Sequence, residues 1–220
     1  MNPARKAALS IALLDQHCIL RDGLESLFGG IEELAVVASV SRPKELSKCF
    51  NVLQLDVVVM GLIFDGHDAL RHITDWSESH PETKFLVLSQ LPEMTCARRV
   101  LDAGGNGYLM KGSSPSALVD GVHRVAAGGV VVSAAIADQL LKDFSKRTTR
   151  DEMNCFDQLT ALELYVLSLI GQGHATAAIA TKMDISKEAV STCKERLKTK
   201  LSITCSQQLM QIALQRLGRL

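Results

Sequence analysis

The chain has 220 residues with equal numbers of basic and acidic side chains, 24 of each, and its length suits one large or two small domains with real cores. The six cysteines are scattered without the CxxC pairs of zinc sites, which excludes a dense disulfide scaffold and indicates reduced thiols. The N-terminal apolar run is too short for a signal peptide, and no segment reaches the roughly 18 apolar residues of a membrane span, so we expect a soluble cytoplasmic protein.

Five short apolar runs rich in β-branched residues are typical of buried strands. They cover residues 9–15, 34–40, 56–61, 84–90 and 107–111. Stretches of helical period separate these runs, and the alternation favours a parallel sheet with helices on both faces. The runs are almost continuously apolar, as expected for strands covered on both sides. The pattern predicts one doubly wound α/β domain over residues 1–130.

Helix signals mark the end of this domain and the start of a second one. Ser114 is a candidate N-cap, and Pro115 occupies the first helical position after it. A further helix and a polar, charge-mixed linker are expected over residues 131–156. Beyond them, Thr160 and Glu163 have the spacing of a capping box, which predicts a new helix.

Residues 157–220 have no strand signal and predict a small all-α domain. Four short helices are expected, at 160–172, 175–183, 187–201 and 205–217. The region carries 8 basic residues against 5 acidic ones, whereas residues 1–140 carry 12 against 16. The contrast predicts that a polyanion, if one is bound, meets the second domain.

The ends of the predicted strands form a candidate ligand site. In an open α/β sheet, ligands bind beyond the carboxyl ends of the strands, where the strand order reverses. The residues that fall there are Asp15, Gln16, Gly61, Ser89 and Lys111. We expect them to surround one pocket, in which the strand that ends at Gly61 presents no side chain.

The strand ends "LLDQH", "VVVMGL", "VLSQ" and "GYLMKG" resemble those of the response regulators of two-component signalling. The resemblance covers nearly the whole chain and is strongest with the subfamily that joins a receiver domain to a LuxR-type (NarL/FixJ-like) helix-turn-helix. In that family, the first strand ends in two acidic residues, the third in the aspartate that accepts phosphate, the fourth in Ser or Thr, and the fifth carries a Lys. The residues that match are Asp15, Ser89, Lys111 and the switch-type aromatic Tyr108.

Gln16 and Gly61 depart from the family pattern. Phosphoryl transfer to a carboxylate requires the nucleophile and a Mg²⁺ held by oxygen ligands. Gly61 removes the nucleophile, and Gln16 replaces an acidic side chain by a neutral amide. We therefore predict no phosphate chemistry at this pocket, no metal, no cofactor and no enzymatic activity.

Lys111 then faces a site depleted of negative charge, and we expect it to pair with Asp15. Three interpretations of the pocket stay open. The pair holds the domain permanently in one conformation, or the pocket has lost its role, or another small ligand replaces phosphate there.

In the second domain, the resemblance assigns helix 175–183 as the support and helix 187–201 as the recognition helix of a DNA-binding motif. Periodicity agrees, because one face of helix 187–201 is apolar and suited to packing inside the domain. The residues expected to contact double-stranded DNA are Thr176, Lys182, Lys187, Ser191, Thr192, Lys194, Glu195, Lys198 and Lys200. The family's base-reading positions fall on Ser191, Thr192 and Glu195, with lysines on the phosphates. A surface helix of ordinary mixed charge is the alternative.

The last predicted helix carries an apolar stripe that includes Leu209, Ile212 and Ala213. Such a stripe either completes the core or meets its copy in a second subunit. The resemblance favours a homodimer, in which two recognition helices would contact two half-sites.

Taken together, these features predict a phosphorylation-independent response regulator that binds DNA as a sequence-specific transcriptional regulator. Promoter occupancy would depend on protein concentration, dimerisation or a partner. The alternative is an interaction protein that pairs with another regulator and modulates it, with little DNA affinity of its own. Glu188 and Glu195 motivate this alternative, because each repels DNA phosphates.

Overall fold

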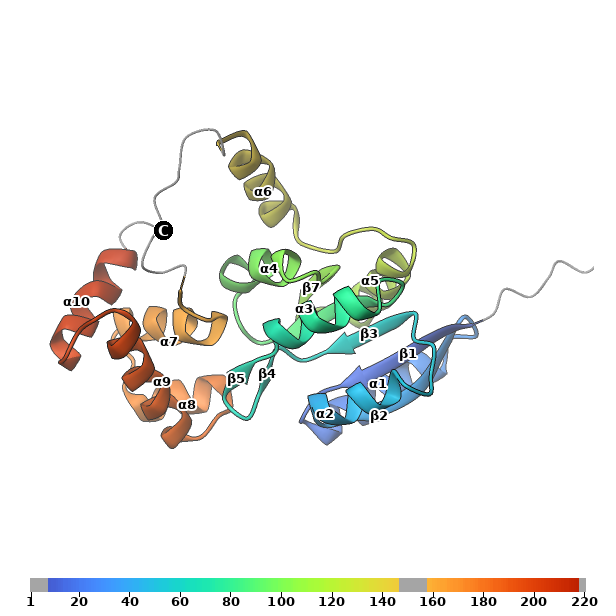
Figure 1. Ribbon diagram of the computed structural model, residues 1–220, viewed down its shortest axis with the longest axis horizontal. Coiled ribbons are helices and arrows are strands. Elements are labelled where there is room, and N and C mark those ends of the chain that lie inside the picture. Colours follow the sequence, from blue (N-terminus) through green and yellow to red (C-terminus); the bar gives the residue numbers. More distant parts are fainter. Residues whose placement is uncertain (1–7, 147–157, 218–220) are drawn as a thin grey trace, which may run out of the picture.

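The structure is a computed structural model that describes residues 8–146 and 158–217 (Figure 1). Its first domain, the sheet domain, contains a five-stranded parallel sheet in the order β2-β1-β3-β6-β7. The strands are β1 (Leu9–Leu14), β2 (Leu34–Val40), β3 (Val57–Met60), β6 (Lys84–Ser89) and β7 (Gly107–Met110). All five predicted strands are therefore confirmed, and the doubly wound order places their carboxyl ends along one edge.

Helices cover both faces of this sheet, as the continuous apolar runs predict. One face packs against α1 (Cys18–Gly29) and α5 (Pro115–Ala126), and the other against α2 (Pro43–Cys49), α3 (Leu70–Ser79) and α4 (Glu93–Asp102) (Figure 1). Side chains alternate along each strand, so Ile11 and Leu13 face α1 and α5, whereas Ala12 and Leu14 face the other helices.

The start of α5 follows the predicted cap. The Ser114 side chain accepts a hydrogen bond from the Ala117 amide at 3.2 Å, and Pro115 occupies the first helical turn. Gly128, at φ 83°, follows the helix end, where a positive φ suits glycine. These local signals fix the segment that leads out of β7, and with it the position of Lys111.

A short hairpin that the sequence analysis did not predict follows β3. It consists of β4 (Ile63–Phe64) and β5 (His67–Asp68), which pair antiparallel. The two turn residues, Asp65 and Gly66, both have positive φ values, 49° and 75°, as tight hairpin turns require. This β4–β5 hairpin projects from the sheet domain toward the second domain (Figure 1).

The second domain, the helical domain, contains α7 (Ala161–Gly171), α8 (Thr176–Met183), α9 (Lys187–Lys200) and α10 (Ser206–Leu217). Each lies within one residue of its predicted bounds. The capping box is also confirmed: Thr160 accepts from the Glu163 amide at 3.2 Å, and Glu163 accepts from the Thr160 amide at 2.7 Å.

Between the domains lies α6 (Ala134–Lys146), which packs on α4 with Ile136 buried. The rest of the predicted linker, residues 147–156, lies outside the described residues. Within the described ranges, no helix has both the length and the apolar character needed to cross a bilayer.

One hydrophobic cluster continues from the sheet domain into the helical domain. It contains Leu91 and Tyr108 on one side and Leu162 and Tyr165 of α7 on the other. Both α4 and β5 contact α7. The helical domain is therefore docked on the end of the sheet where the strand-end pocket lies.

Candidate strand-end pocket and nucleic-acid interface

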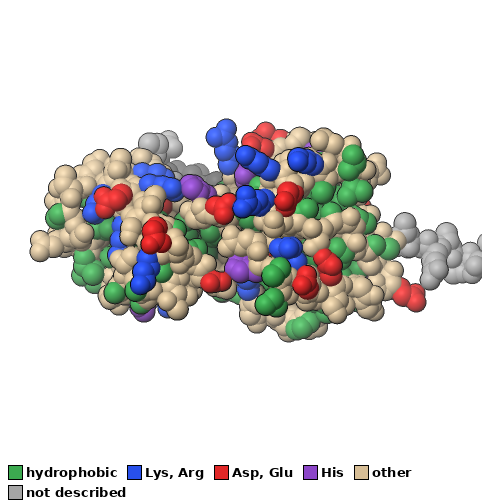
Figure 2. Space-filling view, turned by 90° about the horizontal axis from the view of Figure 1, so that it is seen from below, with side chains coloured by type: hydrophobic (Ala, Val, Ile, Leu, Met, Phe, Trp, Pro, Cys, Tyr) green, Lys and Arg blue, Asp and Glu red, His purple; other side chains and the backbone are tan. Residues whose placement is uncertain are grey.

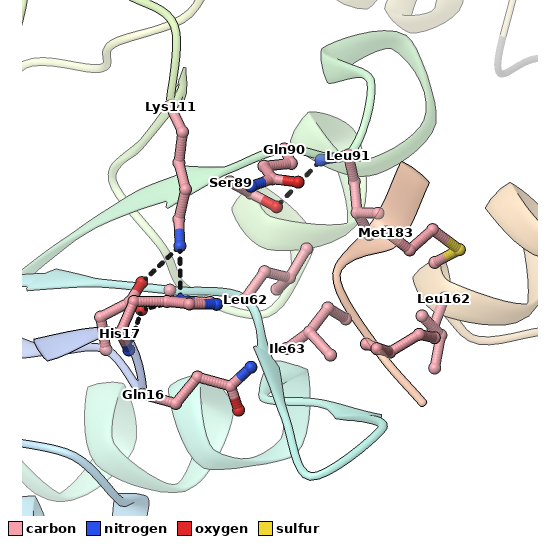
Figure 3. A pocket seen from close by; sticks show the side chains of 13 residues that line it. Gln16, His17, Leu62, Ile63, Ser89, Gln90, Leu91, Lys111, Leu162 and Met183 are labelled. Atoms are coloured by element: carbon pink, nitrogen blue, oxygen red, sulfur yellow. Dashed lines mark hydrogen bonds and ion pairs between the residues drawn. The ribbon is translucent and has the colours of Figure 1, made fainter. Parts of the chain in front are cut away.

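The centre of the pocket is an ion pair between two strand ends. Lys111, directly after β7, places its Nζ 2.8 Å from the Oδ2 of Asp15, directly after β1 (Figure 3). The Asp15 residue is only 5% exposed, so water screens this pair poorly. The expected partnership of Lys111 with Asp15 is present in the structure.

Gly61 makes room for this arrangement. A Cβ added at Gly61 would lie 2.7 Å from the Asp15 Oδ2, a distance that real Cβ atoms do not tolerate. The carboxylate of Asp15 thus fills the space that a side chain at the end of β3 would take. What remains is a cavity of about 40 Å³, which has room for one or two water molecules.

The other predicted pocket residues take different places. Ser89 is buried, and its Oγ accepts from the Leu91 amide at 3.2 Å. Tyr108 is fully buried and donates its hydroxyl proton to the Leu91 carbonyl at 2.7 Å, and burial raises the pKa of this phenol well above its usual range. Gln16 is exposed and extends away from Lys111 (Figure 3).

This arrangement does not fit a divalent cation. Lys111 occupies one oxygen of Asp15, Gln16 turns away, and Gly61 has no side-chain ligand atom. In the described ranges, no group of three His, Cys, Asp or Glu side chains converges on a possible metal position. We therefore assign no metal ligand among these residues.

The helical domain closes the pocket from outside. Leu162 of α7, Met183 of α8 and Ile185 line its outer wall (Figure 3). His17 connects the two domains: its Nδ1 lies 2.6 Å from the Asp15 Oδ1 and its Nε2 lies 3.0 Å from the Asp184 Oδ2. The strand-end pocket is thus an interdomain site.

The α9 helix has the two faces expected of a recognition helix. Val190, Cys193 and Leu197 are buried in the helical domain, and burial raises the pKa of the Cys193 thiol to about 12. On the opposite side, Ser191, Thr192 and Glu195 are exposed. These three side chains are available to base edges in a major groove.

The lysines that we expect to contact DNA phosphates differ in their partners inside the chain. Lys182 and Lys187 are exposed. Lys194 donates to the Thr176 Oγ1 at 2.7 Å, and burial lowers the pKa of its amine. Lys198 pairs with Glu195 at 2.9 Å. Basic and acidic side chains therefore intermingle on this part of the surface (Figure 2).

Lys200 has a structural partner. Its Nζ lies 2.7 Å from the Oε2 of Glu163, which is 2% exposed and caps α7. Removing one partner of such a pair would leave a buried charge uncompensated. Lys200 accordingly holds α9 to α7, in addition to any contact with DNA.

Comparison with known families agrees with both domains. Residues 11–123 match the response regulator receiver domain, and residues 157–213 match the bacterial regulatory proteins of the luxR family. The chain belongs to the LuxR-family response regulators.

Relatives of this response regulator match it over most of its length. It is 29% identical over 206 residues to the response regulator GacA of Pseudomonas aeruginosa, covering 93% of this chain and 95% of that one. It is 28% identical over 213 residues to the oxygen regulatory protein NreC of Staphylococcus epidermidis, covering 94% and 98%.

Solved structures of two regulators have a similar fold. RcsB of Salmonella enterica serovar Typhimurium, bound to a promoter, aligns with a TM-score of 0.55 at 20% identity over 93% of this chain and 97% of its own. A LuxR-family response regulator from Aurantimonas gives a TM-score of 0.57 at 25% identity, covering 63% of this chain and 99% of that one. Family and fold together identify a DNA-binding transcription regulator.

In this response regulator, the β4–β5 hairpin lies against the recognition helix. A Cβ built at Gly66 would stand 3.4 Å from the Cβ of Ala189, and the Nη2 of Arg196 lies 2.9 Å from the Nε2 of His67. Ala189 and Arg196 are seven residues apart and so share one side of α9. The hairpin thus covers the flank of α9 next to the exposed side that carries Ser191, Thr192 and Glu195.

Asp68, at the end of the same hairpin, holds the N-terminus of α7 to the sheet domain. Its Oδ2 accepts from the Ala161 amide at 3.1 Å, at the N-terminus of the helix. Burial raises the pKa of this carboxyl, and the hydrogen bonds from the backbone oppose that shift. Arg99 of α4 adds a hydrogen bond to the carbonyl of Leu159.

The predicted dimerisation stripe is largely internal. Leu209 and Ala213 are 2% and 1% exposed and pack in the core, where α10 contacts α7. The expectation that both meet a second subunit is therefore corrected, since they already complete this domain's core. Ile212 is partly buried, and Leu214 is 53% exposed.

The residues that join the domains were not predicted from the sequence. His17 and Asp184 are 167 positions apart, and His67 and Arg196 are 129 apart. A histidine two residues after a strand-end aspartate was the one local signal for His17. Nothing in the residues around Asp184 pointed to a partner in the other domain.

Proposed function

We propose that this response regulator controls transcription without phosphoryl transfer at its sheet domain. The observation that carries the proposal is the position of the Asp15 carboxylate, which fills the space above Gly61 and binds Lys111 at 2.8 Å. A phosphoryl group needs both a nucleophile and a free cation at that place. The pocket has neither a nucleophile nor a free cation there, so the ion pair of Asp15 and Lys111 replaces the phosphate switch with a constant contact.

The phosphate part of the proposal is tested with the purified full chain. It is incubated with acetyl phosphate and Mg²⁺, and the intact mass is measured. We expect no stoichiometric mass increase. A phosphoryl group on a carboxylate at close to one per chain would overturn the proposal, whichever aspartate carries it.

The DNA part of the proposal is sequence-specific binding through α9. It is supported by the exposure of Ser191, Thr192 and Glu195 on one face of that helix. Ser and Thr hydroxyls bind several bases, and a carboxylate accepts from cytosine N4. Lys182 and Lys187 would bind phosphates and make the affinity salt-dependent.

Selection of bound DNA fragments followed by sequencing tests the proposed sequence-specific binding. Unphosphorylated protein is incubated with random and genomic DNA fragments at two salt concentrations, and enriched fragments are compared. We expect a motif that is lost in the Ser191→Ala, Thr192→Ala double variant and retained in the control Thr204→Ala, an exposed position outside α9. Retention that only falls with salt and enriches no motif would contradict sequence-specific binding.

We further propose that the DNA-bound form is a homodimer. The support is Leu214, a large apolar side chain that is 53% exposed near the end of α10. A two-fold repeat in the selected motif, together with a dimer mass in sedimentation that Leu214→Ser reduces, would agree with this assembly. A single half-site bound by a monomer would contradict it.

One observation favours the second candidate, an interaction protein that modulates another regulator. Four of the basic side chains on α9 are already engaged inside the chain, by Thr176, His67, Glu195 and Glu163. If selection yields no motif, capture of a second regulator by the sheet domain becomes the function to test.

A further inference from the structure

His17 stands between two carboxylates that belong to different domains. Its Nδ1 lies 2.6 Å from Oδ1 of Asp15, and its Nε2 lies 3.0 Å from Oδ2 of Asp184. Asp15 is buried and also accepts from the His17 amide at 2.9 Å and from Lys111. The imidazole is therefore fixed to the sheet domain by Asp15, and its outer nitrogen points at the helical domain.

The two contacts need two protons on the ring. An ionised carboxylate only accepts hydrogen bonds, whereas a neutral imidazole has one N–H and one lone pair. Only the imidazolium form of His17 can donate to Asp15 and Asp184 at once. In the neutral form, the 2.6 Å contact keeps the single proton on Nδ1, so the lone pair of Nε2 faces the Asp184 oxygen.

Two cations lie on the sheet-domain side of this ring. Lys111 places its Nζ 3.3 Å from the His17 Nδ1, and Arg21 of α1 donates from Nη1 to the carbonyl of Asp15 at 2.5 Å. Both oppose a further positive charge on the imidazole, while Asp15 and Asp184 favour it.

Asp184 is well placed to transmit this contact to DNA binding. It is the C-cap of α8, in the left-handed conformation at φ 53° and ψ 47°, three residues before α9 begins. With the domains docked, the β4–β5 hairpin lies on the Ala189 and Arg196 side of α9. An α-helix with its side chains is about 10–12 Å wide and the major groove is about 12 Å wide, so the groove walls must follow both flanks of the helix. The hairpin occupies one of those flanks, and α9 cannot enter a groove until the domains separate.

We propose that His17 is a proton-dependent latch between the two domains. Protonated His17 holds Asp184 and adds to the contacts that keep α9 against the hairpin, and loss of the proton weakens this docking, so that more chains release the helical domain for DNA. The inference rests on the proposed function, since its output is DNA binding. It adds a stimulus, a rise in pH, where the family's phosphate switch has been lost.

The test measures domain separation and DNA binding separately, on the full chain. Small-angle X-ray scattering follows the radius of gyration at fixed salt from about pH 5.5 to about pH 8, the range in which histidines change charge. We expect the ratio of docked to separated chains to fall about tenfold, the value of one exposed hydrogen bond to a charged group. Fluorescence anisotropy with a selected duplex should show affinity rising with pH, although loss of positive charge by itself weakens binding to DNA.

Asp184→Asn is the informative variant, because an amide can donate to or accept from either form of His17. Its scattering should be flat across the pH range, and its DNA affinity should not rise with pH. Asp120→Asn is the matched control, an exposed aspartate on α5 that should keep the wild-type pH response. Circular dichroism of each variant shows whether the fold is retained.

The outcomes separate the latch from the proposed function. If neither the radius of gyration nor the DNA affinity of the wild-type chain changes with pH, the latch is overturned and the proposal of DNA binding stands. If the radius of gyration responds to pH but the chain binds no DNA at any pH, the latch is supported and the proposed function is overturned. A pH response that persists in Asp184→Asn would show that another group titrates, and would also overturn the latch.

Discussion

Gly61→Ala is the substitution that most directly probes the strand-end pocket. The added Cβ would lie 2.7 Å from Oδ2 and 3.4 Å from Cγ of Asp15, so the carboxylate must move. Lys111 and His17 hold that carboxylate at 2.8 and 2.6 Å, and a shift breaks at least one of these charge-assisted bonds. Such a bond contributes about 1.5–3 kcal/mol, whereas a tolerated Gly→Ala change gains about 0.4–1 kcal/mol from the unfolded chain. We expect a net loss of about 1–2 kcal/mol in the free energy of unfolding.

Urea denaturation measures this loss as a lower midpoint. Gly23→Ala is the matched control, because Gly23 lies in α1 with nothing within 4 Å of an added Cβ, and it should stabilise the chain. A double-mutant cycle with Asp15→Ala should recover most of the loss, since the clash is then removed. If Gly61→Ala stabilises the chain as Gly23→Ala does, the carboxylate does not fill the space above Gly61 and the account of the pocket is wrong.

Three further measurements test other parts of the structure. Burial raises the pKa of the Cys193 thiol to about 12, so maleimide at neutral pH should label the exposed Cys205 of the native protein and leave Cys193 unlabelled until urea is added, as mass spectrometry would show. Tyr108→Phe removes the donor to the buried Leu91 carbonyl and should lower the free energy of unfolding by about 1–2 kcal/mol in urea melts, and an unchanged midpoint would refute that bond. Burial raises the pKa of the Asp68 carboxyl, so its contribution to stability is full in acid and is lost as pH rises through the raised value. Asp68→Asn, whose amide oxygen can still accept from the α7 backbone, should therefore be at least as stable as wild type at pH 7, with the advantage shrinking in acid, and a large loss at pH 7 would contradict this.

The interdomain contacts give the strand-end pocket a defined structural role. Gly61 follows β3 and has no side chain, and the space above it is filled by the Asp15 carboxylate, which binds Lys111 and His17. The pocket thus connects the sheet to the turn between α8 and α9. In the proposed latch, a change of charge at His17 reaches α9 through its hydrogen bond to Asp184.

The sequence by itself determined the elements and their order. Continuous apolar runs predicted the five strands, and caps such as Ser114 and the Thr160–Glu163 box placed helix starts to within a residue. These features depend on neighbouring residues, so a local pattern records them. The strand-end set was also predictable, because the carboxyl ends of parallel strands meet at one edge of the sheet.

Only the tertiary structure decided which of these residues act together. The β4–β5 hairpin has strands of two residues, too short for a periodic signal. The apolar stripe with Leu209 and Ala213 suits either a core or a dimer, and its packing on α7 decided for the core. The bond of His17 to Asp184 joins residues 167 positions apart, and a charged side chain does not record in its own neighbourhood which distant partner the fold will bring to it.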